Sequence, residues 1–487
     1  MRLKDPCRTM PPGGALRDRG KNGFRRQIPD RHVSRPLFSE ILLFAVPLMV
    51  TYIMQVLFSA IDLAVIGRFG SADSMAAVGS CSPLITFFLS LFFGLSAGAN
   101  VVVANAIGAR EGKKISRAVH TTMASALWSG GILAVIGILF ARTALVWMET
   151  PPEVLPKGTL YLQLYFAGVP LVFFYNFGAA ILRAGGDTRR PMYFLLVAGA
   201  AKVLINLLLV SVFELDVAGV AAATVIANGI SSVLVMNALR AAKGSGRLVL
   251  KKLRIHPETL RDILKIGIPA GLQGSCFGLS NVVIQSAVNS FGPAAMAGNA
   301  AGISLEGIVY VGGNAFYFAA ISFVGQNYGA KKYKRLLRSF FCCLAFSCGI
   351  TTVLGWGICL AGRPLLSIYN PDREVIECGM VRLKYMLIPY MLNCTMDIFS
   401  AGLRGLGHSF KPMLATLTGV CLFRVAWVWW ILPLNRTMEM LFISYPISWI
   451  LVSVVNGLMF YFVLRGLFRQ AAHSVPEAPG RHSALRS

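Results

Sequence analysis

Five ionisable side chains lie deep inside long apolar stretches of the sequence: Asp62, Lys202, Glu306, Asp397 and Arg424. A charge in the middle of a membrane-spanning helix costs at least about 2.5–3.5 kcal/mol. Each residue is therefore considered first as a group that binds a proton or a cation during transport. The structural alternatives are a hydrogen-bonded carboxylate, a lysine that extends to water, or one half of an ion pair.

Two residues of a later apolar stretch are spaced to meet Asp62. By helical rise Asn206 reaches about the depth of Asp62, and Lys202 lies one turn away on the same helix face. Lys202 is predicted either to form an ion pair with Asp62 or to occupy the place of a bound cation. Pro47 precedes Asp62 in the same stretch. Because proline removes a helix hydrogen bond, we expect either a gating kink there, linked to protonation of Asp62, or a plain irregularity of the helix.

A second group of candidates lies in the C-terminal half. Glu306, Asp397, Arg424 and Gln273 are the predicted polar network of this half, with Glu306 and Arg424 at mid-depth. In an internal repeat of the sequence, Asp397 corresponds to Asn176 of the first half, which is a further candidate for proton or cation coupling. An arginine–carboxylate pair among Glu306, Asp397 and Arg424 would neutralise buried charge. This structural interpretation stands beside a transport role for the three residues.

The composition excludes most soluble classes of protein. Apolar residues make up 55% of the 487 residues and charged residues 14%, with a mean hydropathy of +0.64. A soluble domain carries about 25% charged residues, so a soluble enzyme, a nucleic-acid-binding protein and a disordered scaffold are all poor interpretations. The net charge of +25 indicates basic cytoplasmic loops in a membrane protein.

No catalytic or metal-binding pattern appears. The ten cysteines have no C-x-x-C spacing, the six histidines have no metal-ligand spacing, and a phosphate-binding P-loop is absent. We therefore predict free thiols, no enzymatic activity and no cofactor.

Apolar segments of membrane-spanning length follow one another after residue 37. A span needs about 20 mostly apolar residues. The twelve predicted spans are 38–67, 76–106, 118–146, 159–183, 191–213, 217–240, 260–290, 295–327, 336–362, 378–403, 411–434 and 440–465. The predicted fold class is an all-α integral membrane protein.

The basic residues orient these spans. With twelve spans, 36 of the 46 Lys and Arg residues fall on the side of the two termini and eight on the other side. The positive-inside rule then places both termini in the cytoplasm, with the protein in the plasma (inner) membrane. Residues 1–36 are expected to form a disordered basic tail and residues 467–487 a second cytoplasmic tail.

The sequence also repeats itself. The segment 182–192 aligns with 403–413 at an offset of 221, and Gly108-Ala109 aligns with Gly329-Ala330 at the same offset. Because each half holds an even number of spans, the halves enter the membrane in the same direction, as parallel repeats of transporters do. We predict two six-helix lobes, 37–240 and 258–466, related by a parallel pseudo-two-fold axis and joined by a cytoplasmic linker at 241–257.

Paired motifs give the sequence a family resemblance. They are Phe58–Gly70, Ala76–Gly79, the Leu-Arg-(x)2-Gly-(x)4-Pro-Met signal at 182–192 and 403–413, Ile268–Gln273, and Phe323–Ala330. The sequence resembles the MATE (multidrug and toxic compound extrusion) family, in its DinF-like branch. The resemblance implies a twelve-helix, two-lobed exporter that exchanges H⁺ or Na⁺ for organic, often cationic, substrates.

The resemblance also assigns roles to some residues. Asp62 matches the acid of the family's first helix, and the resemblance implies that it couples proton or cation movement to transport. Asp397 matches a tenth-helix acid that some members use for cation binding. Lys202 departs from the asparagine usual at its position. The seventh-helix acid of those members is missing, since Gln273 opens a stretch without a carboxylate. The missing acid favours H⁺ as the coupling ion, and Na⁺ stays open as the alternative.

Two other functions remain open at this point. One is a flippase for a lipid-linked precursor, which a strongly cationic cavity would favour. The other is an integral-membrane transferase. That function would need a surface-accessible cluster of acids or histidines with a phosphate-binding loop, and the sequence contains no such pattern. The expected partners are a small organic, cationic substrate and the lipid bilayer, without nucleic acid, and the expected state is a monomer.

Overall fold

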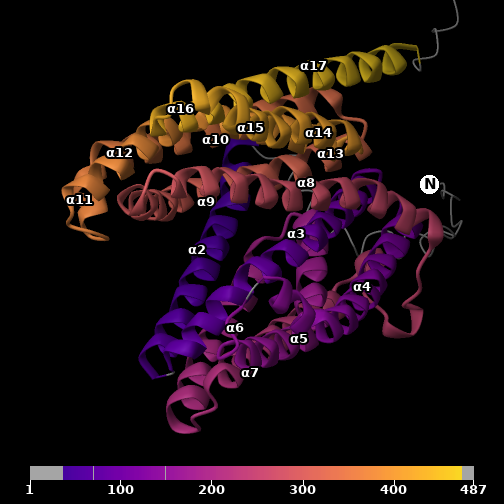
Figure 1. Cartoon of the computed structure of the whole chain (residues 1–487). Coiled ribbons are helices and arrows are strands. Elements are labelled where there is room, and N and C mark those ends of the chain that lie inside the picture. The colour runs from indigo at the N-terminus through magenta and orange to yellow at the C-terminus, as the bar shows by residue number, and fades with distance from the viewer. Residues whose placement is uncertain (1–36, 70, 149, 474–487) are drawn as a thin grey trace, which may run out of the picture.

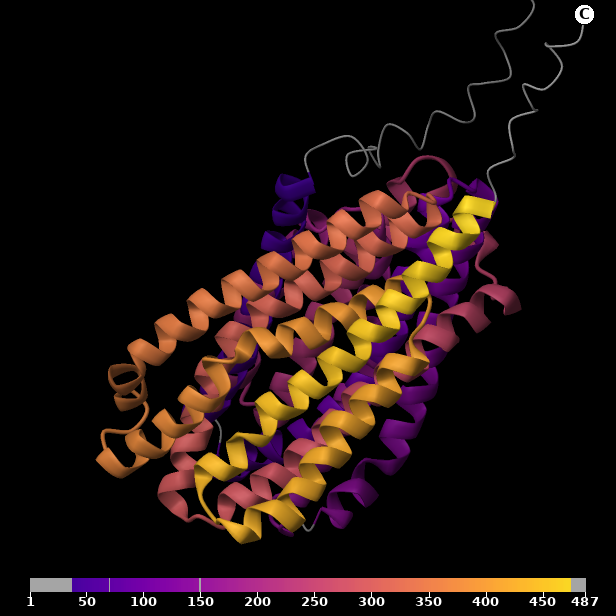
Figure 2. The same ribbon diagram turned by 90° about the horizontal axis from the view of Figure 1, so that it is seen from above.

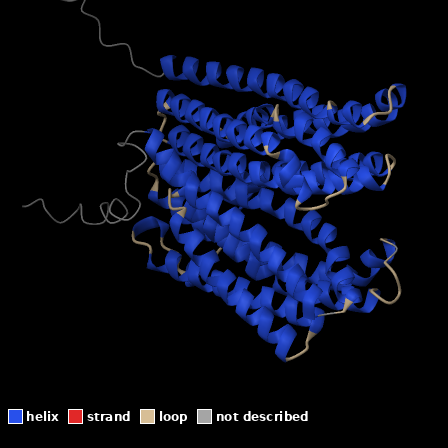
Figure 3. Cartoon of the chain, turned by 90° about the vertical axis from the view of Figure 1, so that its left-hand side faces the viewer, coloured by secondary structure: helices blue, strands red, loops and turns tan. Residues whose placement is uncertain are grey.

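The computed structural model describes residues 37–69, 71–148 and 150–473, and all regular elements in these ranges are helical (Figure 3). The first half contains α2 (Leu37–Phe69), α3 (Ala72–Gly108), α4 (Gly112–Trp147), α5 (Leu155–Ala184), α6 (Arg189–Leu207) continued by η2 (Leu208–Val212), and α7 (Asp216–Ala241). The linker holds η3 (Gly244–Gly246) and η4 (Leu250–Lys252). The second half contains α8 (Pro257–Asn289), α9 (Pro293–Gly329), α10 (Tyr333–Leu360), α11 (Gly362–Ser367), α12 (Arg373–Leu387), α13 (Tyr390–Gly405), α14 (Phe410–Thr416), η5 (Leu417–Leu422), α15 (Phe423–Ala426), η6 (Trp427–Ile431), η7 (Leu432–Leu434), α16 (Met438–Phe442) and α17 (Ser444–His473).

These helices provide twelve membrane-spanning segments. Ten continuous helical segments in the described ranges are long and apolar enough to span a bilayer. The other two segments are α8, whose first turns carry charged side chains, and the pair α12–α13, which is interrupted at Pro389. The predicted all-α, twelve-helix fold class is therefore confirmed. The C-terminal helix α17 runs on to His473, past the predicted start of a tail at residue 467. The predicted tail 1–36 lies outside the described residues.

The repeat seen in the sequence is also a repeat of backbone conformation. Gly186 and Gly407, which occupy equivalent positions of the two halves, both have positive φ, 88° and 85°. Their N–H groups donate to the carbonyls of Arg183 and Arg404 respectively, both at 2.8 Å. A left-handed residue at this place closes a helix at little cost only when it is glycine, so both halves end the corresponding helix in the same way.

The two halves form two layers that meet at one end (Figure 1). The helices of the second half, including α17, lie roughly parallel to one another (Figure 2). The connections from α3 to α4, α5 to α6, α7 to α8, α9 to α10 and α13 to α14 lie at one end of the bundle, which we call the basic end because Lys and Arg residues gather in and beside them. The layers meet towards the basic end and diverge towards the other end.

Helix α2 crosses from one lobe to the other (Figure 1). Near the basic end, Phe44 and Leu48 are buried in a core with Phe316 of α9. Near the opposite end, Ile66 is buried in a core to which the first half of the chain contributes every buried member except Ile263 of α8. Because α2 is part of both cores, a movement of one lobe relative to the other must bend or tilt this helix.

Glycines bring the lobes into backbone contact towards the basic end. A Cβ atom added at Gly94 of α3 would lie 2.0 Å from the backbone nitrogen of Gly271 on α8. One added at Gly108 would lie 2.0 Å from the Gln326 carbonyl oxygen on α9. Small residues permit such close approach of membrane helices. We call Gly94 and Gly108 of α3, together with Gly271 of α8 and Gln326 of α9, the glycine seam. Nearer the opposite end, α9 exposes Tyr310, in keeping with the divergence of the lobes.

The linker between the lobes is folded against α4. His120, itself buried, lies with Nδ1 2.7 Å from the Ser116 carbonyl oxygen, and its Nε2 is 3.1 Å from the Val249 N–H, which donates to it. Leu248 is buried beside this contact. The imidazole therefore ties an otherwise exposed basic linker to the first lobe.

Replacing His120 by Leu should release this linker. The variant loses the acceptor for the Val249 N–H. The free energy needed to separate the linker from α4 therefore falls by about 0.5–1.5 kcal/mol, the contribution of one hydrogen bond. We expect trypsin to cleave after Lys251 and Lys252 several-fold faster than in the wild type, as followed by mass spectrometry. The exposed pair Lys331-Lys332 serves as an internal control whose cleavage rate should not change; equal rates at both places would contradict the proposed tie.

Candidate functional site

The structure brings Asp62 together with Lys202 and Asn206. Asp62 lies on α2, and the other two lie one turn apart on α6. The Lys202 ammonium donates to Oδ2 of Asp62, and the Asn206 amide donates to Oδ1 at 3.0 Å. The predicted ion pair is therefore present. The side chains of Asp62 and Lys202 are only 16% and 14% exposed, so the pair is largely shielded from solvent.

The arrangement leaves one group unsatisfied. Both carboxylate oxygens of Asp62 are engaged, but the Oδ1 atom of the fully buried Asn206 has no hydrogen-bond partner in the described part of the chain. Removing the charge from Asp62 would cost Lys202 its counter-ion. In a site of low polarity the loss of a counter-ion is a large change in local energy.

Asn176 is not part of this group. Its amide donates to the Val172 carbonyl of its own helix at 2.8 Å, and no contact between Asn176 and Asp62 is found among the described residues. Pro47 is buried near the place where α2 leaves the second-half core, and its carbonyl accepts a 2.7 Å hydrogen bond from Thr51. A threonine bonded back to the preceding turn favours bending of a helix.

The acid–arginine pair of the second half differs from the prediction. Glu306 pairs with Arg382, at 2.5 Å, and not with Arg424. Arg382 also donates to Asn299 at 2.6 Å. The sequence did not single out Arg382, although it falls inside the predicted span 378–403: it is 6% exposed and lies in the core of the second lobe.

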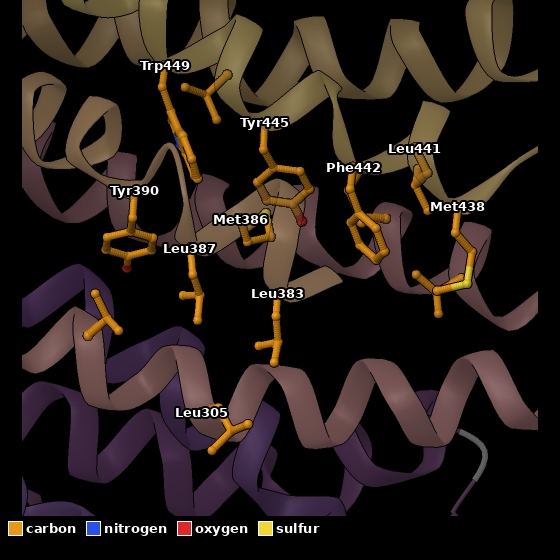
Figure 4. Close-up of a cluster of buried hydrophobic side chains, with 14 of the residues drawn as sticks. Leu305, Leu383, Met386, Leu387, Tyr390, Met438, Leu441, Phe442, Tyr445 and Trp449 are labelled. Atoms are coloured by element: carbon orange, nitrogen blue, oxygen red, sulfur yellow. The ribbon is translucent and has the colours of Figure 1, made fainter. Parts of the chain in front are cut away.

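Arg424 uses aromatic rings in place of an acid. Its guanidinium carbon lies 3.7 Å from the centroid of the Tyr445 ring, and its Nε donates to Ser448 at 3.1 Å. Figure 4 shows Tyr445 and Trp449 in the same apolar cluster as Leu383 of α12. Contact with aromatic faces stabilises a desolvated cation by about 2 kcal/mol, which lets Arg424 remain buried without a carboxylate.

Replacing Arg382 by Met should destabilise the second lobe strongly. The change leaves Glu306 as an unpaired, largely buried carboxylate, a type of loss that costs about 3–5 kcal/mol. Chemical unfolding in detergent micelles measures it. The double variant Arg382→Met/Glu306→Leu should recover most of this loss, and Arg373→Met, at an exposed position of the same helix, should change little. A single variant as stable as the wild type would show that the pair is not a stabilising element.

Arg404 is a second buried arginine that the sequence did not single out as a site. It donates to the Tyr317 hydroxyl and to the Gln273 amide oxygen, and Asp397 lies near both Arg404 and Tyr317. Gln273 is thus hydrogen-bonded to an arginine that also lies close to Asp397, and neither composition nor depth along the helices predicts this arrangement. The signal was present, since Arg404 belongs to the Leu-Arg motif repeated at Arg183.

Metal binding receives no support from acidic or thiol clusters. Within the described ranges no group of three or more His, Cys, Asp or Glu side chains could hold a metal ion. The nine described cysteines are all free thiols.

Comparison with known proteins identifies several similar chains. The sequence matches the MatE family over residues 47–209 and 269–430, two stretches whose starting points are equivalent in the internal repeat. It is 27% identical over 385 residues to the probable multidrug resistance protein YoeA of Bacillus subtilis (strain 168), covering 78% of this chain and 83% of that one. It is 24% identical over 407 residues to the probable multidrug resistance protein NorM of Thermotoga maritima, covering 82% and 86%.

Solved structures share the fold. A crystal structure of MATE in the bent conformation superimposes with a TM-score of 0.84, over 91% of this chain and 98% of that chain. An outward-facing conformation of a multidrug resistance MATE family transporter of the MOP superfamily gives 0.82, over 92% and 98%. Both are 19% identical to this chain, so the likeness concerns the arrangement of the helices.

Proposed function

The chain belongs to the MatE family of membrane transporters, and from this premise we propose that it exports organic compounds in exchange for protons by alternating access. Its similar chains YoeA and NorM bear the name of probable multidrug resistance proteins, which supports a broad range of substrates. Members of the family are transporters and not enzymes. The DinF-like branch remains a prediction, and the lipid-flippase alternative is set aside because these relatives do not favour it.

The proposed orientation places the basic end in the cytoplasm of the cell, with the protein in the plasma membrane. The positive-inside rule supports this side for the loops of the basic end. The lobes are joined at this end by the glycine seam and diverge at the other. On this orientation the described conformation faces outward, and substrate would be released from between the lobes.

Coupling is proposed to reside at Asp62. The observation that carries this proposal is the engagement of both Asp62 oxygens by Lys202 and Asn206 inside the first lobe. A proton bound by Asp62 removes the charge that holds Lys202, and α2 transmits the change, with Pro47 as the proposed bending point. Asn176 has no contact that adds it to this group.

A proton fits this site better than Na⁺. A sodium ion needs several oxygen ligands, but the Lys202 ammonium already occupies one oxygen of Asp62 and the Asn206 amide donor the other. Na⁺ would have to displace a tethered cation, whereas a proton binds the carboxylate itself. In the second lobe, Asp397 lies beside Arg404, which likewise supplies positive charge where a cation would bind. No cofactor is part of the proposal.

The experiment is efflux from vesicles that contain the purified protein. A fluorescent organic compound is loaded, and a pH gradient or a Na⁺ gradient is imposed separately. We expect the pH gradient to drive efflux and the Na⁺ gradient to have no effect. Efflux driven only by Na⁺ would overturn proton coupling, and absence of efflux with either gradient, for both anionic and cationic dyes, would overturn the exporter itself.

A further inference from the structure

An aromatic cluster joins α2 and α9 where the two lobes meet. The ring centroids of Tyr52 and Phe318 are 6.2 Å apart in a stacked arrangement, and those of Tyr317 and Phe318 are 5.2 Å apart, edge to face. Tyr52 lies on the helix that crosses between the lobes. The cluster therefore presents aromatic surface from both α2 and α9 at one place.

Two arginines related by the repeat flank this cluster. Arg183 lies in the last turn of α5, and Arg404 lies in the last turn of α13, the equivalent helix of the second half. Side chains on a helix lean towards its N-terminus, so both guanidinium groups reach back from the basic end into the bundle. That of Arg183 lies 5.5 Å from the centroid of Phe318, and that of Arg404 lies 5.7 Å from the centroid of Tyr317.

The two arginines differ in how well they are satisfied. Arg404 is buried, bonds to Tyr317 and Gln273, and has the carboxylate of Asp397 nearby. Arg183 is only part-buried, and it has neither a hydrogen bond nor an ion pair among the described residues. Its Nε atom is enclosed without a partner. The first lobe thus presents a guanidinium with unused donors beside an aromatic surface of the second lobe.

This chemistry selects the charge of a ligand. A guanidinium forms strong, often paired hydrogen bonds to a carboxylate or phosphate, and aromatic faces stack on planar rings. An organic cation at the same place would be repelled by the Arg183 charge, and Arg404 lies close to the nearby acid, Asp397, and offsets its negative charge. The arrangement therefore opposes the preference for cationic substrates that the family resemblance implies.

We infer that Arg183, Tyr52 and Phe318 form a binding subsite for planar aromatic compounds that carry a carboxylate or phosphate. The aromatic part of the ligand stacks against Tyr52 and Phe318, and its anionic group accepts hydrogen bonds from Arg183. As a substrate site, this inference rests on the proposed exporter function; as a binding site, it can be tested without transport.

The test compares two dyes with the same xanthene ring and opposite charge, the anion fluorescein and the cation rhodamine 123. Binding to the purified full-length protein in detergent is measured by fluorescence anisotropy. We expect the wild type to bind fluorescein more tightly than rhodamine 123. Arg183→Gln should weaken fluorescein binding about tenfold, the effect of losing one charged hydrogen bond, and should not weaken rhodamine 123 binding. Arg183→Lys should retain part of the preference.

The control variant is Arg189→Gln, at an exposed arginine of the same end, which should leave both affinities unchanged. A wild type that prefers rhodamine 123 overturns the inference, and this result needs no variant to fold. An equal loss of both dyes in Arg183→Gln also overturns it, since that would mean a structural role for the arginine. If no dye is exported in vesicles, the exporter proposal fails while the order of the two affinities still decides this inference.

Discussion

Replacing Asp62 by Asn is expected to reduce efflux driven by a pH gradient to the level of empty vesicles, a loss of at least about tenfold. Asparagine has the shape of the protonated acid but cannot gain or lose a proton. The site would then be fixed in its uncharged form, and the pH gradient could no longer change the conformation of α2 through protonation. The measurement is the vesicle assay described above, with wild type and variant at equal protein density.

Loss of transport must be separated from loss of stability. Asp62→Asn leaves the Lys202 ammonium without its carboxylate, and breaking a buried pair is destabilising. The double variant Asp62→Asn/Lys202→Met removes both charges and should restore thermal stability without restoring efflux. Asp73→Asn, at an exposed acid on α3, should transport normally. Gradient-driven efflux at wild-type rate in Asp62→Asn would remove this residue from the mechanism.

The pair in the first lobe could be predicted because Asp62, Lys202 and Asn206 all lie in regular α-helix, the last two before η2 begins at Leu208. Depth along a straight helix grows in proportion to residue number, so the positions of Asp62 and Asn206 could be compared before any contact was known. Lys202 follows from the same rule, since four residues make one turn. The direction in which each helix crosses the membrane was predicted from the distribution of Lys and Arg between the loops of the two sides alone.

The pair in the second lobe could not be found in this way. Helix α12 carries charged side chains near its start and the helix is interrupted at Pro389, so hydropathy did not place Arg382 among the deeply buried ionisable residues. Helical periodicity held the missing signal: Val375, Gly379 and Met386 lie on the same face as Arg382, and all four are buried. Which acid this arginine meets depends on how α9 packs against α12, and a single sequence does not contain that packing.

The crossing of α2 between the lobes was also beyond the sequence. Its apolar residues surround the helix on all sides, so no face indicates a preferred neighbour. The structure shows that Leu48 belongs to the second-half core and Ile66 to the first-half core. The predicted repeat assigned the whole helix to one lobe, because sequence repeats report ancestry and not packing partners.

Adding one methyl group at Gly94 should prevent the basic end from closing. In Gly94→Ala the new Cβ would lie 2.0 Å from the backbone nitrogen of Gly271 and 2.4 Å from its Cα. Backbone atoms cannot move aside as a flexible side chain can, so α3 and α8 must separate. We expect the conformation open at the basic end to dominate, and transport to fall at least about tenfold because the outward-facing state is no longer reached.

Distances between spin labels at the other end report this shift directly. Labels at Phe213 and Leu434, both exposed and on different lobes, should move closer in Gly94→Ala if the lobes rock about the seam. Gly79→Ala is the matched control, because it lies on the same helix and an added Cβ there meets nothing within 4 Å. If Gly94→Ala keeps the wild-type distances and transport rate, the seam is not the surface on which the lobes close. The lobes would then have to alternate by bending α2 alone, and the effect of Asp62 on transport would be confined to the first lobe.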